Sequence, residues 1–435
     1  MLARVLLLVV FVFATGCEKT NHENIDKWMK TEKGPGKLKK AVADEGLDAD
    51  LSAHAAANLV RINAEPDLRA AIEHMSEARQ VALIGKLAPR LWDLARVERE
   101  DALPGPQQIN AKDMLVFLRK HADATERAQI DGYLVDWYGV VSYEDRAKRG
   151  ATLGAAVMRM VGPAGGKKLI SVLNGLIAAP GQDKTRFRIG DELMLGMAAS
   201  ADPDAVRYLL DVARMDRGDP SLPKRAMNAL VTAYVDPRGL FDIADPAPLV
   251  ANLPALVTVA KDEALAGQPA NDAISLIRMT GAASCLPPLV GMIGYPHRDP
   301  LFRYAVTYAA IYCGGPKAIV DVVRAIPDGP YVQVELHDAI AVEIAKLAPK
   351  QAVLDALRQL LDDKGKVAKW VAIEALGAMK SVEDRPKIAA LAGNKEVLVG
   401  YWGDQSDKAA KDRKRDPTLG QRAKEVADAL ATSAN

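Results

Sequence analysis

One unit, a pair of short helices joined by a turn, recurs along most of this chain and constrains its fold more than any other feature. In the stretch VAKWVAIEALGAMKSVEDRPKIAALAGN, which begins at Val367, apolar residues recur every three or four positions, pause at a polar turn and then resume. The stretch LFRYAVTYAAIYCGGPKAIVDVVRAIPD, which begins at Leu301, follows the same plan. Apolar residues at this spacing lie on one face of a helix, so each stretch predicts two antiparallel helices.

The spacing of these units predicts the architecture of the whole body. The second helix of each pair is expected to begin near Lys167, Asp204, Val250, Leu286, Pro316, Lys350 and Asp384. Successive starts are 30 to 46 residues apart, which is about the length that two helices of ~12 residues and two turns require. Aromatic residues make up only 5% of the chain and alanine is abundant, which favours close-packed helices over sheets. We predict an all-α fold over residues 37–435.

The same stretches resemble HEAT and HEAT-like repeats. The short bacterial form of these repeats carries an A-x-x-ALG signature, which is present here as AIEALGAM from Ala372. The resemblance extends from about residue 37 onward and is strongest from Tyr143 to Ala392. It implies an α-solenoid, in which each helical hairpin buries its apolar face by packing on its neighbours. Such repeats indicate an architecture and leave the function open.

The N-terminal residues predict an export signal. Arg4 is the single charge before an apolar run from Val5 to Phe13, which has the length of a signal-peptide core and is too short to span a bilayer. The following ATGC resembles the lipobox of bacterial lipoproteins, although Ala14 stands where leucine is commonest. That resemblance implies cleavage after residue 16 and a lipid-modified Cys17. The alternative is an ordinary secretory peptide with a chance cysteine at its end.

This interpretation predicts a location at the cell envelope. Residues 1–16 would be the signal peptide, and residues 17–36 the lipidated cysteine and a polar tether that holds the helical body off the membrane. Glu18 is not the aspartate that tends to hold lipoproteins at the inner membrane of enteric bacteria. We therefore expect an outer-membrane anchor with the body in the periplasm, and the inner membrane and the cell surface stay open.

Two further cysteines, Cys285 and Cys313, fall in neighbouring predicted hairpins. An exported chain meets an oxidising compartment, where a disulfide between them is permitted. The alternative is two separate buried thiols that behave as small apolar side chains.

A polar pair recurs at equivalent positions of three predicted second helices. The stretches LLDVARM, IVDVVRA and VLDALRQ pair Asp211 with Arg214, Asp321 with Arg324, and Asp355 with Arg358. Residues three apart lie on one face of a helix, so we expect ion pairs within each helix. Such pairs are either a solvated surface, which we favour, or a polar ladder that lines a binding groove.

No catalytic motif, metal-ligand spacing or cofactor-binding motif accompanies the repeats, so we predict neither an enzyme nor a cofactor. The 57 Lys and Arg residues balance 56 Asp and Glu residues, which is unlike a nucleic-acid-binding protein. We predict a lipid-anchored, non-catalytic scaffold that binds an envelope protein or peptide, with its oligomeric state open. The alternatives are a HEAT-like enzyme or enzyme accessory, lyase-like, that cradles a small molecule or cofactor, and a purely structural spacer.

Overall fold

The computed structural model describes residues 19–99, 101–178, 189–215, 219–235, 241, 243–327, 334–402 and 409–432. These residues form α-helices joined by turns and short 3₁₀ helices, and a lone bridge between Val397 and Thr418 is the only β pairing among them. The predicted all-α class is confirmed. Contacts divide the chain into two compact units, with the division between Val157 and Met158. None of the described helices is both long and apolar enough to cross a bilayer.

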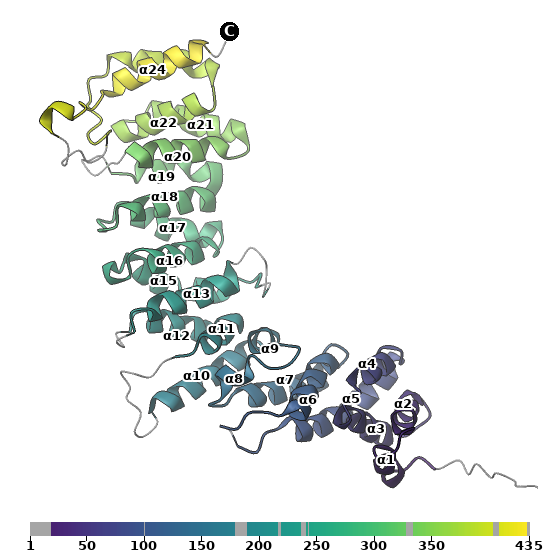
Figure 1. Ribbon diagram of the computed structural model, residues 1–435. Helices are drawn as coiled ribbons and strands as arrows, with labels where there is room; N and C mark the ends of the chain where they lie inside the picture. Colours follow the sequence, from purple (N-terminus) through teal and green to yellow (C-terminus); the bar gives the residue numbers. More distant parts are fainter. Residues whose placement is uncertain are drawn as a thin grey trace, which may run out of the picture. The chain divides into compact units, whose positions relative to one another are not determined.

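Unit 1 is built around a central alanine-rich helix, α3, which contacts α1, α2, α4, α5 and α6 (Figure 1). Ala53, Ala55, Ala56 and Leu59 of α3 are fully buried, because small side chains let several helices approach one axis closely. The helices of unit 1 are α1 (His22–Trp28), α2 (Gly34–Ala43), α3 (Ala49–Arg61), α4 (Glu65–Glu73), α5 (Glu77–Ala95), α6 (Pro106–Leu118), α7 (Ala124–Tyr138) and α8 (Tyr143–Arg146).

The tether predicted over residues 17–36 is wrong from His22 onward. The Asn21 side chain accepts a hydrogen bond from the backbone N–H of Asn24 and begins α1, and α2 already starts at Gly34. Ile25 and Trp28 of α1 are buried, at 0% and 5% exposure. Two apolar residues three apart give this short helix one buried face, which the polar composition of the segment obscures.

Unit 2 contains the helices that the repeats predict. After α9 (Gly154–Val161), which spans the division, come α10 (Pro163–Ala178), α11 (Asp191–Ala199), α12 (Pro203–Ala213), α13 (Leu222–Tyr234), α14 (Ala247–Ala251), α15 (Leu253–Lys261), α16 (Gln268–Arg278), α17 (Ala282–Ile293), α18 (Pro300–Gly314), α19 (Ile319–Arg324), α20 (Val334–Lys346), α21 (Lys350–Leu361), α22 (Lys366–Ala378), α23 (Arg385–Ala390) and α24 (Leu419–Thr432). Proline occupies the first turn of many of them, where its missing N–H costs no intrahelical hydrogen bond.

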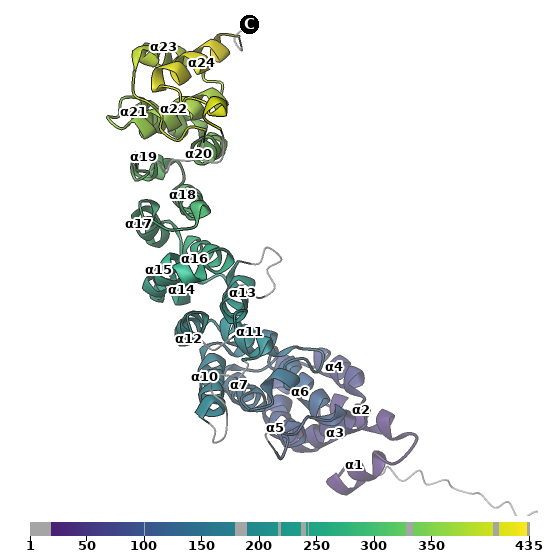
Figure 2. The same cartoon turned by 60° about the vertical axis from the view of Figure 1, so that its left-hand side comes forward.

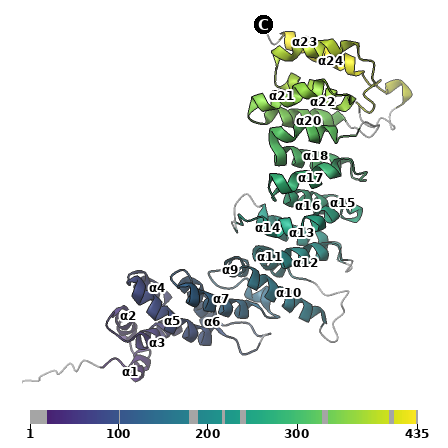
Figure 3. The same cartoon turned by 180° about the vertical axis from the view of Figure 1, so that it is seen from behind.

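Two rows of helices run through unit 2 (Figure 2). The first-helix row contains α11, α13, α16, α18, α20, α22 and α24, and each of these contacts the next. The second-helix row contains α10, α12, α15, α17, α19 and α21, with contacts between α10 and α12, α12 and α15, α17 and α19, and α19 and α21. Each row therefore places residues from different hairpins side by side, and α20, α22 and α24 follow one another toward the C-terminus (Figure 3).

Candidate binding surface

Three tyrosines lie along α18 at four-residue spacing. Tyr304, Tyr308 and Tyr312 share one face of the helix, and their rings contact in sequence, with centroids 6.1 Å and 4.6 Å apart. Tyr312 is 39% exposed, and the other two are half-buried. Phe302 and Val306 of the same helix are buried in the core. The helix therefore packs one face inward and presents a row of aromatic rings on another.

Tyr312 connects this row to the next helix of the first-helix row, α20. Its hydroxyl donates a hydrogen bond of 2.6 Å to Oε2 of Glu343, whose other oxygen pairs with Lys346 Nζ at 2.7 Å. The hydrogen bond to Glu343 raises the pKa of Tyr312, while Lys346 and Tyr312 lower the pKa of Glu343. At neutral pH the surface therefore carries a neutral tyrosine hydroxyl that donates a hydrogen bond. The Glu343 carboxylate that accepts it is ionised, and its charge is balanced by Lys346.

Beside Glu343, Val342 is 44% exposed and lines a cavity of about 320 Å³. This volume is at the lower end of the range of ligand pockets. The cavity lies between three helices of the first-helix row, α20, α22 and α24, and its lining residues are Ala341, Val342, Glu374, Gly377, Ala378, Lys380, Val426, Ala429 and Leu430. Most of these side chains are apolar or small, and Glu374 is paired with Arg422 at 2.9 Å. The cavity thus fits an apolar group.

These features lie on α18, α20, α22 and α24, each of which contacts the next, and they are called here the tyrosine surface. It is defined by Tyr304, Tyr308, Tyr312, Val342 and the cavity. Exposed aromatic residues beside an apolar pocket are typical of the anchor positions of protein interfaces, where tyrosine is enriched. The repeat pattern does not predict this surface, although the four-residue spacing of the three tyrosines in YAVTYAAIY could have indicated it.

The arginines of the three predicted polar pairs mostly pair between hairpins rather than within a helix. Arg214 Nε lies 3.4 Å from an Asp262 oxygen, Arg324 Nε lies 2.7 Å from one of Asp363, and Arg358 Nε lies 2.7 Å from one of Asp384. Each of these aspartates belongs to a later hairpin. The within-helix prediction is therefore wrong for Arg214 and Arg324. The cause is the reach of the arginine side chain, which extends past its own helix to a carboxylate at the next turn.

Two of the aspartates in the predicted pairs contact other residues, and the third forms no salt bridge with any described residue. Asp211 accepts hydrogen bonds from Arg207, four residues earlier, and Asp355 accepts one from Gln351. Only Asp355 keeps a contact with its predicted arginine, Arg358, at 3.8 Å. No described residue forms a salt bridge with Asp321. The arginines thus join successive hairpins, and Asp211 and Arg214 also line a small cavity of about 100 Å³ between α12 and α15.

Cys285 of α17 and Cys313 of α18 are bonded as a disulfide, with Cα atoms 6.4 Å apart. This separation is within the usual range for disulfides. The bond joins a helix of the second-helix row to the tyrosine-bearing helix of the first. Cys17 lies outside the described residues, as do the signal-peptide residues 1–16.

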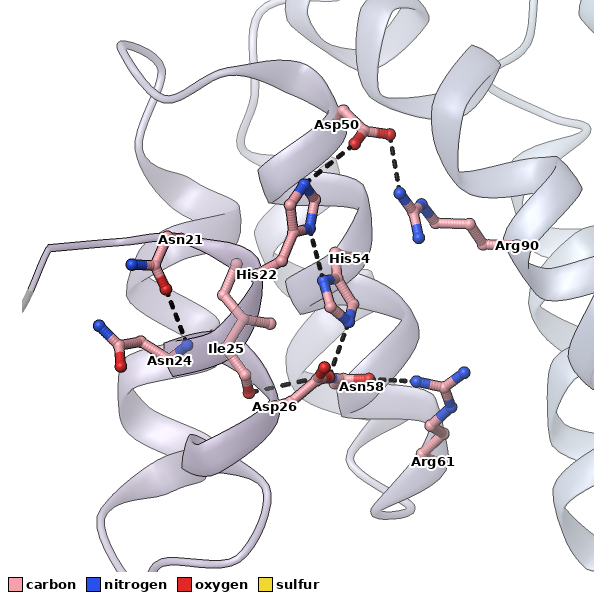
Figure 4. Close-up of polar contacts among 10 residues, drawn as sticks. All are labelled: Asn21, His22, Asn24, Ile25, Asp26, Asp50, His54, Asn58, Arg61 and Arg90. Carbon is pink, nitrogen blue, oxygen red and sulfur yellow. Dashed lines mark hydrogen bonds and ion pairs between the residues drawn. The ribbon is translucent and has the colours of Figure 1, made fainter.

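A second polar cluster lies in unit 1, between α1 and α3 (Figure 4). The Nδ1 atoms of His22 and His54 are 2.8 Å apart. The other ring nitrogen of each histidine faces a carboxylate, with His54 Nε2 2.8 Å from Asp26 and His22 Nε2 3.5 Å from Asp50. His22 falls within the predicted tether, and no local spacing relates it to His54, 32 positions away, so the sequence does not predict this pair.

One carboxyl group of the first-helix row, outside the sites described above, has a raised pKa. Burial raises the pKa of Asp272 on α16 to about 6, against the attraction of Lys224, and its Oδ2 has no hydrogen-bond partner among the described residues. Asp272 does not line the cavity between α20, α22 and α24. Within the described ranges no three histidine, cysteine, aspartate or glutamate side chains gather closely enough to hold a metal ion.

No protein-family model matches this chain, and no curated protein is similar to it in sequence.

Proposed function

We propose that this protein is a lipid-anchored, non-catalytic scaffold that binds a polypeptide segment of an envelope protein on the tyrosine surface. The observation that carries the proposal is the row of tyrosines on α18, which ends at the exposed Tyr312 bonded to α20, together with the apolar cavity between α20, α22 and α24. These four helices are adjacent in one row. A polypeptide can lay successive side chains along such a row and insert one into the cavity.

The architecture we propose for this scaffold is a HEAT-like α-solenoid. The support for it is the repeated hairpin pattern of the sequence, the AIEALGAM stretch from Ala372, and the two rows of sequential helix contacts in unit 2. In such an architecture each hairpin contacts mainly its neighbours, so an extended surface accumulates from repeated units.

The anchor we propose is a lipid on Cys17, supported by the resemblance of ATGC to a lipobox. Several acyl chains would hold the protein at the envelope, with the outer membrane favoured. Anchoring would raise the local concentration of the scaffold near a membrane-associated partner, which strengthens its capture without any new contact.

A small molecule in the cavity is the second candidate, in keeping with a HEAT-like enzyme accessory. The observation that favours it is the volume of 320 Å³. Two observations weigh toward the scaffold instead. The tyrosines extend beyond the cavity onto α18, and the acidic group in the cavity wall, Glu374, is already paired with Arg422.

Site-specific photocrosslinking in cells tests the proposal. A photoreactive phenylalanine at Tyr308 or at Val342 is compared with the same residue at Lys387, which is exposed on α23 outside the tyrosine surface. The scaffold predicts one dominant envelope protein crosslinked from positions 308 and 342 but not from 387, and loss of that product in Cys17→Ser. Identical products from all three positions, or none from 308 and 342, would refute it. A small ligand recovered from the purified protein, with no crosslinked protein, would favour the second candidate.

A further inference from the structure

The contact between α1 and α3 contains a chain of polar groups with two histidines at its centre. From one end it runs from Arg90 to Asp50 at 2.8 Å, then to His22, His54 and Asp26. At the Asp26 end, Asn58 Nδ2 donates to Asp26 at 3.0 Å, and Arg61 donates to Asn58 at 2.7 Å. Figure 4 shows the two imidazole rings between their carboxylates, each ring on a different helix.

The geometry fixes how many protons this pair can hold. An ionised Asp26 accepts a hydrogen bond from His54 Nε2–H, so this ring nitrogen carries a proton. The short Nδ1 to Nδ1 contact has room for one proton between the rings, so one Nδ1–H donates a hydrogen bond and the other Nδ1 accepts it. Protons on both Nδ1 atoms would point the two N–H groups directly at each other. The docked pair therefore excludes two fully protonated rings.

The surroundings of His54 do not favour a second charge either. Burial lowers the pKa of His54, whose side chain is only 11% exposed. Arg90 of α5 and His22 also lower this pKa, whereas Asp26 raises it. The charged groups that act on the two carboxylates are Arg61 on α3 and Arg90 and Lys86 on α5. Elsewhere on these helices, Glu23 and Lys27 of α1 pair with each other, and Lys37 of α2 lies over the Trp28 ring. Two facing imidazolium rings would repel each other across a half-buried contact.

We propose that the His22–His54 pair makes the docking of α1 on α3 pH-dependent, so that α1 is held at neutral pH and released under mildly acidic conditions. Release would free the segment that follows the predicted anchor residue Cys17, including Ile25 and Trp28 of α1. This inference concerns unit 1 alone and does not depend on what binds the tyrosine surface.

The sign of the effect follows from proton linkage. A histidine whose pKa is lowered by docking binds its proton more readily when α1 is free, so docking is complete above the ordinary value of 6.5 and is lost as pH falls below it. The pKa values of Asp26 and Asp50 are lowered, so these carboxylates stay ionised in the same range. Exclusion of one proton predicts that the equilibrium constant for docking of α1 falls about tenfold between about pH 7.5 and pH 5.5.

Hydrogen exchange of the full-length protein tests this proposal. Protection factors of the α1 amides, corrected for the intrinsic effect of pH, are compared with those of α5 from about pH 7.5 to 5.5. We expect protection in α1 to fall about tenfold while protection in α5 is unchanged. The same scan is made with His54→Gln and His22→Gln, which cannot be protonated, and with His74→Ala, an exposed histidine outside the contact.

The variants decide between the histidine pair and a general effect of acid. The proposal requires the pH-dependent loss of α1 protection in the wild type and in His74→Ala, and its absence in both glutamine variants. If a glutamine variant leaves α1 undocked at every pH, protection is low throughout and still does not change with pH. Unchanged protection in the wild type, or the same loss in the glutamine variants, would overturn the proposal.

Discussion

The contact at α1 and the tyrosine surface use opposite chemistry. At α1 the polar groups satisfy one another, and the apolar residues Ile25 and Trp28 are buried beneath them. On α18 and α20 the apolar and aromatic groups, including Tyr312 and Val342, are left exposed. A closed network of titratable groups can respond to protons, whereas exposed aromatic groups have surface available for a partner. The degree to which polar groups satisfy one another, rather than polarity alone, therefore separates a regulatory contact from a binding surface.

The largest expected effect is on the α1 side. Replacement of Trp28 by alanine should weaken the docking of α1 by about 3–5 kcal/mol, because a buried tryptophan is lost from a helix with only two buried side chains. Hydrogen exchange should then show α1 unprotected at neutral pH while α22 is unaffected. Protection of α1 that survives this change would show that docking does not depend on the buried face of α1.

On the tyrosine surface, the double change Tyr308→Ala and Tyr312→Ala should reduce partner binding by about 30-fold or more, equivalent to about 2 kcal/mol. Because Tyr312 is exposed and Tyr308 is only half-buried, the variant should still be folded at the temperature of the binding assay. Binding is measured by titration of the crosslinked partner once it is identified. The matched control is Tyr133→Ala, a tyrosine of α7 that stacks on Trp92 in unit 1. An equal loss of binding in that control would argue against the tyrosine surface.

The ion pairs between hairpins should contribute to stability according to burial. Arg358→Ala should destabilise unit 2 by about 1–3 kcal/mol, because it leaves Asp384, whose side chain is 3% exposed, without its charged partner. Burial acts to raise the pKa of Asp384, but the hydrogen bond and positive charge of Arg358 help to hold it below its ordinary value. The matched change Arg214→Ala removes a pair whose arginine side chain is 42% exposed and should cost less than about 1 kcal/mol. Chemical denaturation of both variants measures this difference, and equal effects would contradict the dependence on burial.

The smallest expected effect is at the edge of the cavity. Val342→Asp should weaken partner binding by about tenfold, or about 1.4 kcal/mol, because it places a carboxylate beside an apolar cavity and next to Glu343. Its effect on stability should be within about 0.5 kcal/mol, since Val342 is 44% exposed. Unchanged binding would restrict the tyrosine surface to α18 and sharpen its boundary.

The sequence predicted the helices of unit 2 well because their apolar periodicity is repeated. It did not predict α1, since a seven-residue helix with two buried residues gives almost no periodic signal. It identified the arginines of the ladder but not their partners, because a spacing rule describes one helix while Arg324 reaches Asp363 in a later hairpin. His22 and His54 are brought together by the packing of α1 on α3, which no local pattern encodes.

The disulfide between Cys285 and Cys313 has a consequence for proteolysis. The turn between α17 and α18 lies inside the 28-residue span that this bond closes. A protease that cuts the turn would leave the two parts of the chain covalently joined, and the helix with the three tyrosines would stay attached to α17. Fragments would separate on a denaturing gel only after reduction. In an oxidising compartment rich in proteases, a nicked copy of this protein would thus keep its surface in one piece.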